Sequence, residues 1–536
     1  MTQTDERRVS RRRVTLAALV VCAAAIVPYL PTIDDYFVRD DFGVVQLLAH
    51  KPATYFPRWF YTSWMDHIWG YTPDEIRPFP AVSYQLTALG GAASPVLHHV
   101  VNIALHAANG VLVMAMAMAA ASLSLRAAAF AGVMFVLLPV HTESVAWITG
   151  RVDSMPAFFY FASFLAFVRW RERGSSSLRL YLWSVAIFFV ALFTKQNTIT
   201  MVGTLVAYDV LVRRAALTPI VAFVWPYVPF GILTVGYLYL RYLLFGEVAR
   251  EGTLNAKGLA DFAALFNRHL AHVVIGEHTA SRVAAWLIIA GVMLVALWLA
   301  RKTPLEKTSA IGSVLYFGPV WWLIGVAPVM VAGYASPRHV YLAAAGWAIV
   351  VAIVLDRLAN RRGVALNRVA AAAVIIIALY LVPLYGSLRE WTATAAVSQK
   401  AVRDLRGAAL AAPAGSLVIA GAPTRSWDWA LPFAARPPFT RTNLYDRVFI
   451  ISPRSLSCCT APWFEETRTA IREWSRGNGR DSAVVLRWDP DSGALTEARS
   501  ADLPQLTVLT RSLADLERPE DLDKNLLRMI DVFTGR

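Results

Sequence analysis

Two adjacent carboxylates, Asp40 and Asp41, stand in the stretch YFVRDDFG (36–43), directly after the first apolar run of the chain. Such a pair suits two kinds of chemistry: removal of a proton from an acceptor hydroxyl, and binding of a divalent cation. Either chemistry also needs groups that bind a substrate, so the other ionisable residues decide which reaction the pair serves.

A second concentration of ionisable residues lies in PVHTESVAWITGRVD (139–153), which carries His141, Glu143, Arg151 and Asp153. A solvated turn would explain these residues, and so would a site for a charged lipid headgroup. Trp147 suits a position at a membrane interface. The choice depends on where the loop lies relative to a membrane.

The composition is that of a polytopic membrane protein. Of the 536 residues, 57% are hydrophobic and only 16% are charged, whereas about a quarter of a soluble protein is charged. Apolar runs of about 18 to 25 residues recur, long enough to cross a bilayer as helices. We predict an all-α transmembrane fold of about 11 helices at 14–32, 95–121, 127–140, 154–170, 180–195, 198–212, 217–244, 283–300, 310–332, 340–356 and 369–388.

The loop charges predict the orientation. Much of the net charge of +14 lies in alternate loops, which should be cytoplasmic, so we expect no nucleic-acid partner. We predict a multi-pass protein of the cell (inner) membrane with a cytoplasmic basic N-terminus (1–13). A transmembrane domain (14–388) would include a first outer loop (33–94), and an extracytoplasmic domain (389–536) would follow.

The segment 389–536 differs in character from the rest. The stretches 416–423 and 447–453 have the pattern of buried strands that end in turns, and 483–499 has that of a hairpin turning at 489–493. These features predict a small C-terminal α/β domain.

In this topology the conspicuous cations share the outer face with the aspartates. Besides Arg151 they are Arg77, Lys195, Arg241 and Arg338. For Lys195 and Arg241 the alternative to a binding role is snorkelling to the interface. Cations gathered at one membrane surface suit a phosphate, because arginine can bind two of its oxygens. Together with a base they predict transfer of a group carried on a lipid phosphate.

The predicted span 95–121 carries a polar stripe on one helix face, formed by His99, Asn102, His106 and Asn109. Polar side chains in a span usually face the bundle interior or a wet cavity. The stripe either makes hydrogen bonds between helices or lines and supports a site.

Six stretches occur in an order that resembles the transmembrane and tetratricopeptide-repeat O-mannosyltransferases and their bacterial relatives, in the GT-C superfamily of polytopic glycosyltransferases. The resemblance covers roughly 33–350, and HTESVAWITGRVD is its most specific part. The stretches are FVRDDF, IRPFPAVSYQLTAL, PVLHHVVNIALHAANGVLV, LLPVHTESVAWITGRVDSMPAFF, FTKQNTITM and SPRHVYLAAAG.

The resemblance implies a sugar, mannose or another hexose, moved from a polyprenyl-phosphate donor to an acceptor hydroxyl on the outer face. It implies that Asp40 or Asp41 is the base, with a preference for Asp40. It assigns the donor or substrate site to Arg77, His141, Glu143, Arg151, Asp153, Lys195 and Arg338. No cofactor is required, although a divalent cation at the aspartate pair is an alternative.

The sequence departs from the family at Leu138-Pro139, Lys195-Gln196 and Arg338-His339, and 389–536 shows no tetratricopeptide repeats. The acceptor is therefore open among protein, lipid and polysaccharide. A transporter or lipid-linked sugar flippase would spread its charges through the membrane and often has repeated halves. A non-catalytic scaffold would tolerate the departures, whereas retention of both aspartates favours the enzyme.

Overall fold

The computed structural model describes residues 11–66, 68, 73–91, 93–174, 177–215, 219–248, 259–276, 282–301, 310–421, 430–451, 461–476, 482–497, 507–509, 511–512, 515 and 528. The chain divides into two compact units. The first contains 1–32, 76–80 and 99–389, and the second contains 33–75, 81–98 and 390–536.

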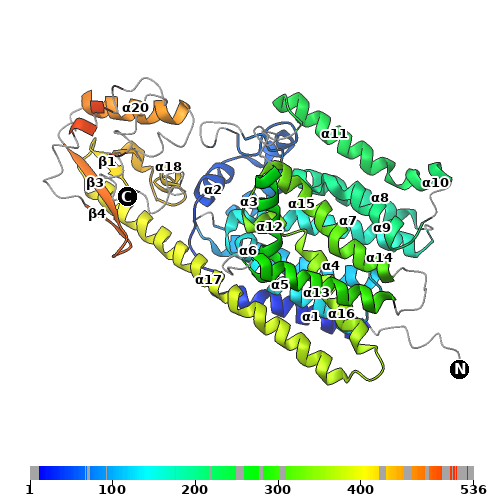
Figure 1. Ribbon diagram of the computed structural model, residues 1–536. Helices are drawn as coiled ribbons and strands as arrows, with labels where there is room; N and C mark the ends of the chain where they lie inside the picture. The colour runs from blue at the N-terminus through cyan, green and yellow to red at the C-terminus, as the bar shows by residue number, and fades with distance from the viewer. Residues whose placement is uncertain are drawn as a thin grey trace. The chain divides into compact units, whose positions relative to one another are not determined.

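The first unit is helical (Figure 1). Because apolar side chains dominate these segments, each satisfies its backbone groups within a helix, as a bilayer requires. Its helices are α1 (Arg11–Ile26), α4 (Val96–Ala119), α5 (Leu125–Leu137), α6 (Thr142–Ala146), α7 (Arg151–Glu172), α8 (Leu178–Leu192), α9 (Met201–Leu211), α10 (Ile220–Val224), α11 (Val228–Phe245), α12 (Leu259–Ile275), α13 (Arg282–Arg301), α14 (Ala310–Leu315), α15 (Trp321–Ala332), α16 (Ala344–Ala359) and the first part of α17 (Leu366–Ala411).

The multi-pass character is clear, but the count of about 11 transmembrane helices is not confirmed. Six described helical segments are long and apolar enough to cross a membrane, or seven when the bent pair Leu125–Leu137 and Pro139–Ala146 is counted as one. The predicted spans on α8, α9 and α16 are helical but shorter than 18 residues, and α7 carries ionic residues at both ends. The six segments are Arg11–Thr32, Val96–Ala119, Ile220–Phe245, Arg282–Arg301, Ala310–Ala332 and Leu366–Ala411.

Small residues let α1, α4 and α5 approach closely. A Cβ atom on Gly110 would lie 2.4 Å from Val136 Cγ1 and 2.8 Å from Val21 Cγ1, and one on Gly132 would lie 2.8 Å from the Gly110 carbonyl oxygen. Such contacts are typical of helix packing in membranes, where small residues bring backbones together. This packing fixes the position of α5 and therefore of the loop that follows it.

The second unit contains α2 (Asp41–Ala49), most of α3 (Pro78–Leu89), α18 (Leu431–Ala434), α20 (Ala461–Arg476) and a four-stranded sheet. The strands are β1 (Leu417–Ala420), β2 (Phe449–Ile451), β3 (Ala483–Asp489) and β4 (Ala494–Glu497), in the order β2-β1-β3-β4. The predicted hairpin is confirmed, since β3 pairs with β4 in antiparallel register.

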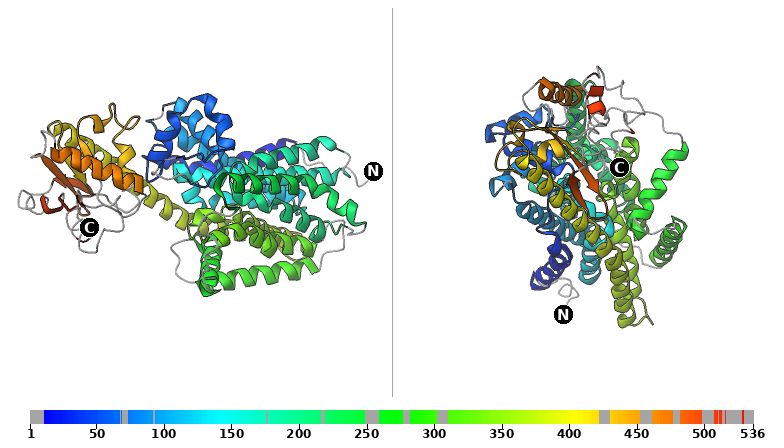
Figure 2. Two further views of the ribbon diagram at one scale, coloured as in Figure 1. Left: turned by 90° about the horizontal axis from the view of Figure 1, so that it is seen from above. Right: turned by 90° about the vertical axis from the view of Figure 1, so that its left-hand side faces the viewer.

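In the sheet, β1 pairs in parallel with both β2 and β3. All four residues of β1 are buried, as expected for a central strand with both faces covered. Helix α20 packs beside β2 (Figure 2). The segment after 389 thus includes a small α/β fold.

A buried ion cluster as the candidate functional site

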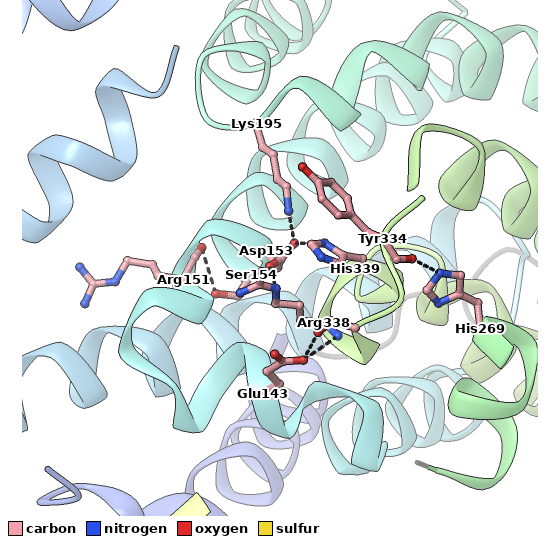
Figure 3. Close-up of polar contacts among 10 residues, drawn as sticks. Glu143, Arg151, Asp153, Ser154, Lys195, His269, Tyr334, Arg338 and His339 are labelled. Carbon is pink, nitrogen blue, oxygen red and sulfur yellow. Dashed lines mark hydrogen bonds and ion pairs between the residues drawn. The ribbon is translucent and has the colours of Figure 1, made fainter. Parts of the chain in front are cut away.

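Asp153 is the centre of a cluster formed by three separate segments of the first unit (Figure 3). It lies in the first turn of α7, and Lys195 Nζ donates a hydrogen bond to its Oδ1 atom. Arg338 Nε lies 3.6 Å from Oδ2, and His339 Nδ1 lies 3.7 Å from Oδ1. The cluster therefore joins three loops that the charge pattern predicts on the same membrane side.

Two charges of this cluster are held out of water. Asp153 is 4% exposed and Lys195 is 5% exposed. Burial alone would raise the pKa of the Asp153 carboxyl, but Lys195, His339 and Arg338 hold that pKa well below its ordinary value. Burial lowers the pKa of His339 to about 3, so this imidazole is neutral at physiological pH.

Several cations surround the Asp153 carboxylate. Lys195 and Arg338 both face the single carboxylate, and the charge of Arg77, itself 6% exposed, also acts on Lys195. Buried cations are costly unless an anion compensates them. The arrangement is suited to accept a further anion.

A cavity of about 400 Å³ opens beside the cluster. Lys195, Arg241 and His339 contribute to its wall, together with the amides of Gln196 and Asn197. Among the described residues, the side-chain oxygens of these two amides have no hydrogen-bond partner. The lining from Leu238, Pro328 and Val331 is apolar. The cavity thus offers cations, polar acceptors and an apolar surface, the combination that an amphiphilic anion needs.

Two of the predicted cations have defined supports. Arg241 is 1% exposed, and its Nε donates to the Val248 carbonyl oxygen at 3.1 Å. The guanidinium of Arg338 lies over the ring of Trp147 at 4.6 Å, a cation–π contact. These contacts orient both guanidinium groups.

Glu143 connects two of the loops. Its Oε2 accepts a hydrogen bond from the Ser336 hydroxyl and lies 3.4 Å from the Arg338 backbone nitrogen (Figure 3). The contact holds η8 (Pro337–Val340), which carries Arg338 and His339, against the loop that carries Glu143. Glu143 therefore positions the cluster.

Arg151 points away from Asp153 (Figure 3). Its Nε donates to Asn102 Oδ1 at 2.8 Å, and Asn102 Nδ2 donates in turn to the carbonyl oxygens of Trp147 and Ile148 at 3.0 and 3.2 Å. Arg151 and Asn102 thus support the loop before α7, and the structure does not bring the Arg151 guanidinium to the ion cluster.

The polar stripe of α4 makes hydrogen bonds between helices. His106 Nδ1 lies 2.7 Å from the Tyr341 hydroxyl, and Asn109 Nδ2 donates to the same hydroxyl at 3.1 Å and to the Ser154 carbonyl oxygen at 2.8 Å. Tyr341 directly follows η8. These contacts agree with the interpretation of the stripe as a set of interhelical hydrogen bonds. The bonds to Tyr341 and Ser154 also hold the two segments that carry Arg338 and Asp153.

His141 is fully buried among rings. Its centroid lies 4.2 Å from that of Tyr341 and 4.5 Å from that of Phe135. Within the described residues neither of its ring nitrogens has a hydrogen-bond partner. His141 thus packs against Phe135 and Tyr341, and it takes no part in the ion pairs of Asp153 within the described residues.

Asp40 and Asp41 belong to the second unit. Asp41 is 1% exposed, and its Oδ2 accepts a hydrogen bond from the Val38 backbone nitrogen at 3.0 Å. Asp40, at the N-cap of α2, is partly exposed. Asp41 therefore stabilises its own loop, whereas Asp40 is the more accessible carboxylate.

Two residues of the cluster were not predicted from the sequence. His339 contacts Asp153 and stacks on Tyr334, with ring centroids 4.5 Å apart, and Ser336 binds Glu143. Both lie close to Arg338 in the short polar loop SPRH (336–339). This position is the sequence feature from which their role could have been predicted. In the described part of the chain, no group of three or more His, Cys, Asp and Glu side chains is arranged for a metal ion.

Comparison with known proteins supports the resemblance. The chain is 31% identical over 219 residues to human Protein O-mannosyl-transferase TMTC4, covering 37% of this chain and 29% of that protein. It is 31% identical over 216 residues to Drosophila melanogaster Protein O-mannosyl-transferase Tmtc2, covering 38% of this chain and 22% of that protein. Its homologues are TMTC O-mannosyltransferases. The chain thus matches less than a third of the length of either relative.

The fold has a known counterpart. ArnT from Cupriavidus metallidurans in the apo state aligns with a TM-score of 0.52 over 89% of this chain and 94% of its own, at 15% identity. At this identity the likeness establishes a shared fold and nothing finer. No family model matches the chain.

Proposed function

We propose that this protein is a membrane glycosyltransferase that moves a hexose from a polyprenyl-phosphate donor to an acceptor hydroxyl. The observation that carries the proposal is the pair of cations, Lys195 and Arg338, that face the buried Asp153 carboxylate beside a cavity whose wall is partly polar and partly apolar. The homology to O-mannosyltransferases supports the sugar-transfer chemistry.

In the proposed reaction the acceptor oxygen attacks the anomeric carbon and its proton passes to Asp40. The bond between that carbon and the phosphate oxygen breaks, with inversion, and polyprenyl phosphate leaves. Lys195 and Arg338 stabilise the negative charge that develops on the leaving phosphate, since preorganised cations in a dry site act strongly on it. Asp40 is the preferred base because its side chain is partly exposed, whereas Asp41 is buried.

Other polar groups have proposed roles in the same complex. Arg241 and Arg77 add positive charge toward the phosphate, and the amides of Gln196 and Asn197 receive hydroxyls of the sugar. The reaction needs no cofactor, and adding EDTA to the assay measures any dependence on a divalent cation at Asp40 and Asp41. The acceptor is a protein, a lipid or a polysaccharide.

We also propose the orientation that the loop charges predict. The N-terminus lies in the cytoplasm, the segment after 389 lies outside the cell (inner) membrane, and about 11 helices cross the bilayer when α7, α8, α9 and α16 are included. The convergence of the loops at Asp153, Lys195 and Arg338 supports placing these three loops on one side.

Binding of the lipid phosphate tests the anion site directly. Undecaprenyl phosphate, which ArnT from Cupriavidus metallidurans binds in a crystal structure, is a suitable probe. Removing Lys195 alone would leave Asp153 buried without its main partner, which is strongly destabilising. The double variant Lys195→Met/Asp153→Asn removes both charges and keeps the two side chains nearly the same size.

We expect the probe to raise the melting temperature of the wild type in detergent, and the double variant to bind it about 10-fold or more weakly, because it lacks one charge-assisted contact. The matched control is Arg169→Met/Glu172→Gln, which removes an exposed ion pair of the same unit. Equal stabilisation of all three proteins by the probe would exclude this cluster as the phosphate site.

A further inference from the structure

The loop that carries the aspartate pair has an unusual backbone. Arg39, next to Asp40, has a φ of +52°, in the left-handed region that non-glycine residues rarely adopt. Such conformations persist only where the surroundings hold them, and they concentrate at functional sites. The contacts around 36–43 therefore show which residues hold the loop.

The part of α17 beyond residue 390 makes several of these contacts, within the second unit. The Ser398 hydroxyl donates to the Phe37 carbonyl oxygen, and both groups are buried. The Thr392 hydroxyl donates to Asp35 Oδ2 at 2.9 Å, and the Arg39 guanidinium lies over the Trp391 ring at 5.3 Å. Trp391 and Ser398 are seven residues apart, so they share one face of the helix.

The region around α18 closes the other side of the same loop. The ring of Phe439 lies 5.0 Å from that of Phe37 and 4.7 Å from that of Phe42, both edge-on. A Cβ atom on Gly43 would lie 3.1 Å from the Phe433 ring, so α2 approaches α18 closely. The aspartate pair thus sits on a loop packed between α17 and the segment 433–439.

We propose that the segment after residue 389 is a positioning part of the catalytic machinery, with Ser398 as its main hydrogen-bonding anchor. Ser398 holds the Phe37 carbonyl, Trp391 holds Arg39, and Phe439 holds Phe37 and Phe42, which together fix the backbone that presents Asp40. The proposal rests on the proposed function for its catalytic meaning, whereas the anchoring of the loop stands on these contacts alone.

The test uses the full-length chain and the variant Ser398→Ala, which removes a single oxygen atom. We expect the backbone amides of 37–42 to exchange hydrogen about 5-fold faster, the change that corresponds to one lost hydrogen bond. We expect kcat to fall by a similar factor while the KM for the donor stays unchanged, because the donor site is formed by other residues. Phe439→Leu, which keeps an apolar side chain, should produce the same pattern.

The matched control is Thr394→Ala on the same helix, since the Thr394 hydroxyl is exposed and donates to the Glu390 carbonyl oxygen of its own helix. Exchange of 37–42 in Ser398→Ala that equals that of the control would overturn the proposal. So would a fall in kcat without faster exchange, or faster exchange with kcat unchanged. If Ser398→Ala shows faster exchange but the wild type transfers no sugar, the anchoring of the loop stands and the proposed function is refuted.

Discussion

At the scale of single residues, the two aspartates have different environments although they are neighbours. Asp41 is buried and its carboxylate receives the Val38 amide, whereas Asp40 is partly exposed at the start of α2. A general base must reach the proton that it removes, and a carboxylate that accepts a backbone amide is better placed to hold a loop. In the proposed function, Asp40 is therefore the catalytic carboxylate and Asp41 stabilises the loop.

Substitutions at Asp41 separate these roles. Asparagine still offers an oxygen to the Val38 amide, whereas leucine offers none, so we expect Asp41→Asn to keep measurable turnover and Asp41→Leu to lose it. The loss in Asp41→Leu should come with a lower free energy of unfolding of about 1–3 kcal/mol, the cost of a buried amide left unsatisfied. Steady-state kinetics and thermal unfolding in detergent measure both effects. Equal activity of Asp41→Asn and Asp41→Leu would contradict the assignment.

The ion cluster predicts how donor affinity depends on pH. The pKa of Asp153 is held below its ordinary value and that of His339 is about 3, so neither group changes its charge between pH 5 and pH 8. A depressed carboxyl pKa gives stability that is present above about pH 4, the unfolded value, and is lost only as the pH falls toward the folded value. We expect the KM for the donor to stay constant as the pH falls from about 7 to 5. A tenfold rise in KM on this acidification would show that a different group binds the donor.

At the scale of elements, the loop between α5 and α7 acts as a frame for the cluster. Pro139 ends α5, and the chain then forms α6 and a short 3₁₀ turn, Ile148–Gly150, before α7 begins. Asn102 binds the carbonyls of this loop, and Glu143 binds the loop that carries Arg338. The ionic residues of HTESVAWITGRVD therefore include structural supports as well as Asp153.

Gly150 tests whether this frame matters. A Cβ atom there would lie 2.3 Å from the Glu143 carbonyl oxygen and 2.8 Å from Ser144 Cα, so Gly150→Ala must displace backbone. We expect the free energy of unfolding to fall by about 1–3 kcal/mol, as in other overpacked interiors. Gly236→Ala is the control, because a Cβ on Gly236 in α11 meets no atom within 4 Å. Equal melting temperatures for the two variants in detergent would show that the loop yields easily.

At the scale of the whole molecule, the sequence predicted helices at the right places because apolar composition and loop charge are local signals. Helices or helical turns occur at all the predicted spans, yet α8, α9 and α16 are too short to confirm each as a crossing. The strands at 417–420 and 449–451 and the hairpin were also predictable from short apolar runs and turn residues.

The site was predictable in its residue types but not in its geometry. The sequence placed Asp153, Lys195 and Arg338 on one side, but the ion pairs depend on how α7 and η8 pack, which no local pattern encodes. The opposite direction of Arg151 and the role of His339 depend on the same packing. The bond between Ser398 and Phe37 joins residues 361 positions apart, beyond the reach of any sequence motif.

Donor consumption by purified wild type and Asp40→Asn tests both the proposed glycosyltransferase activity and the assignment of Asp40 as its base. Both proteins would receive a panel of polyprenyl-phosphate sugars, with membrane extract as the source of acceptor. We expect the wild type to consume one donor and Asp40→Asn to consume it about 10²- to 10⁴-fold more slowly, the usual contribution of a general base. Full turnover by Asp40→Asn would contradict the base assignment, and a wild type that consumes no donor would contradict the glycosyltransferase itself.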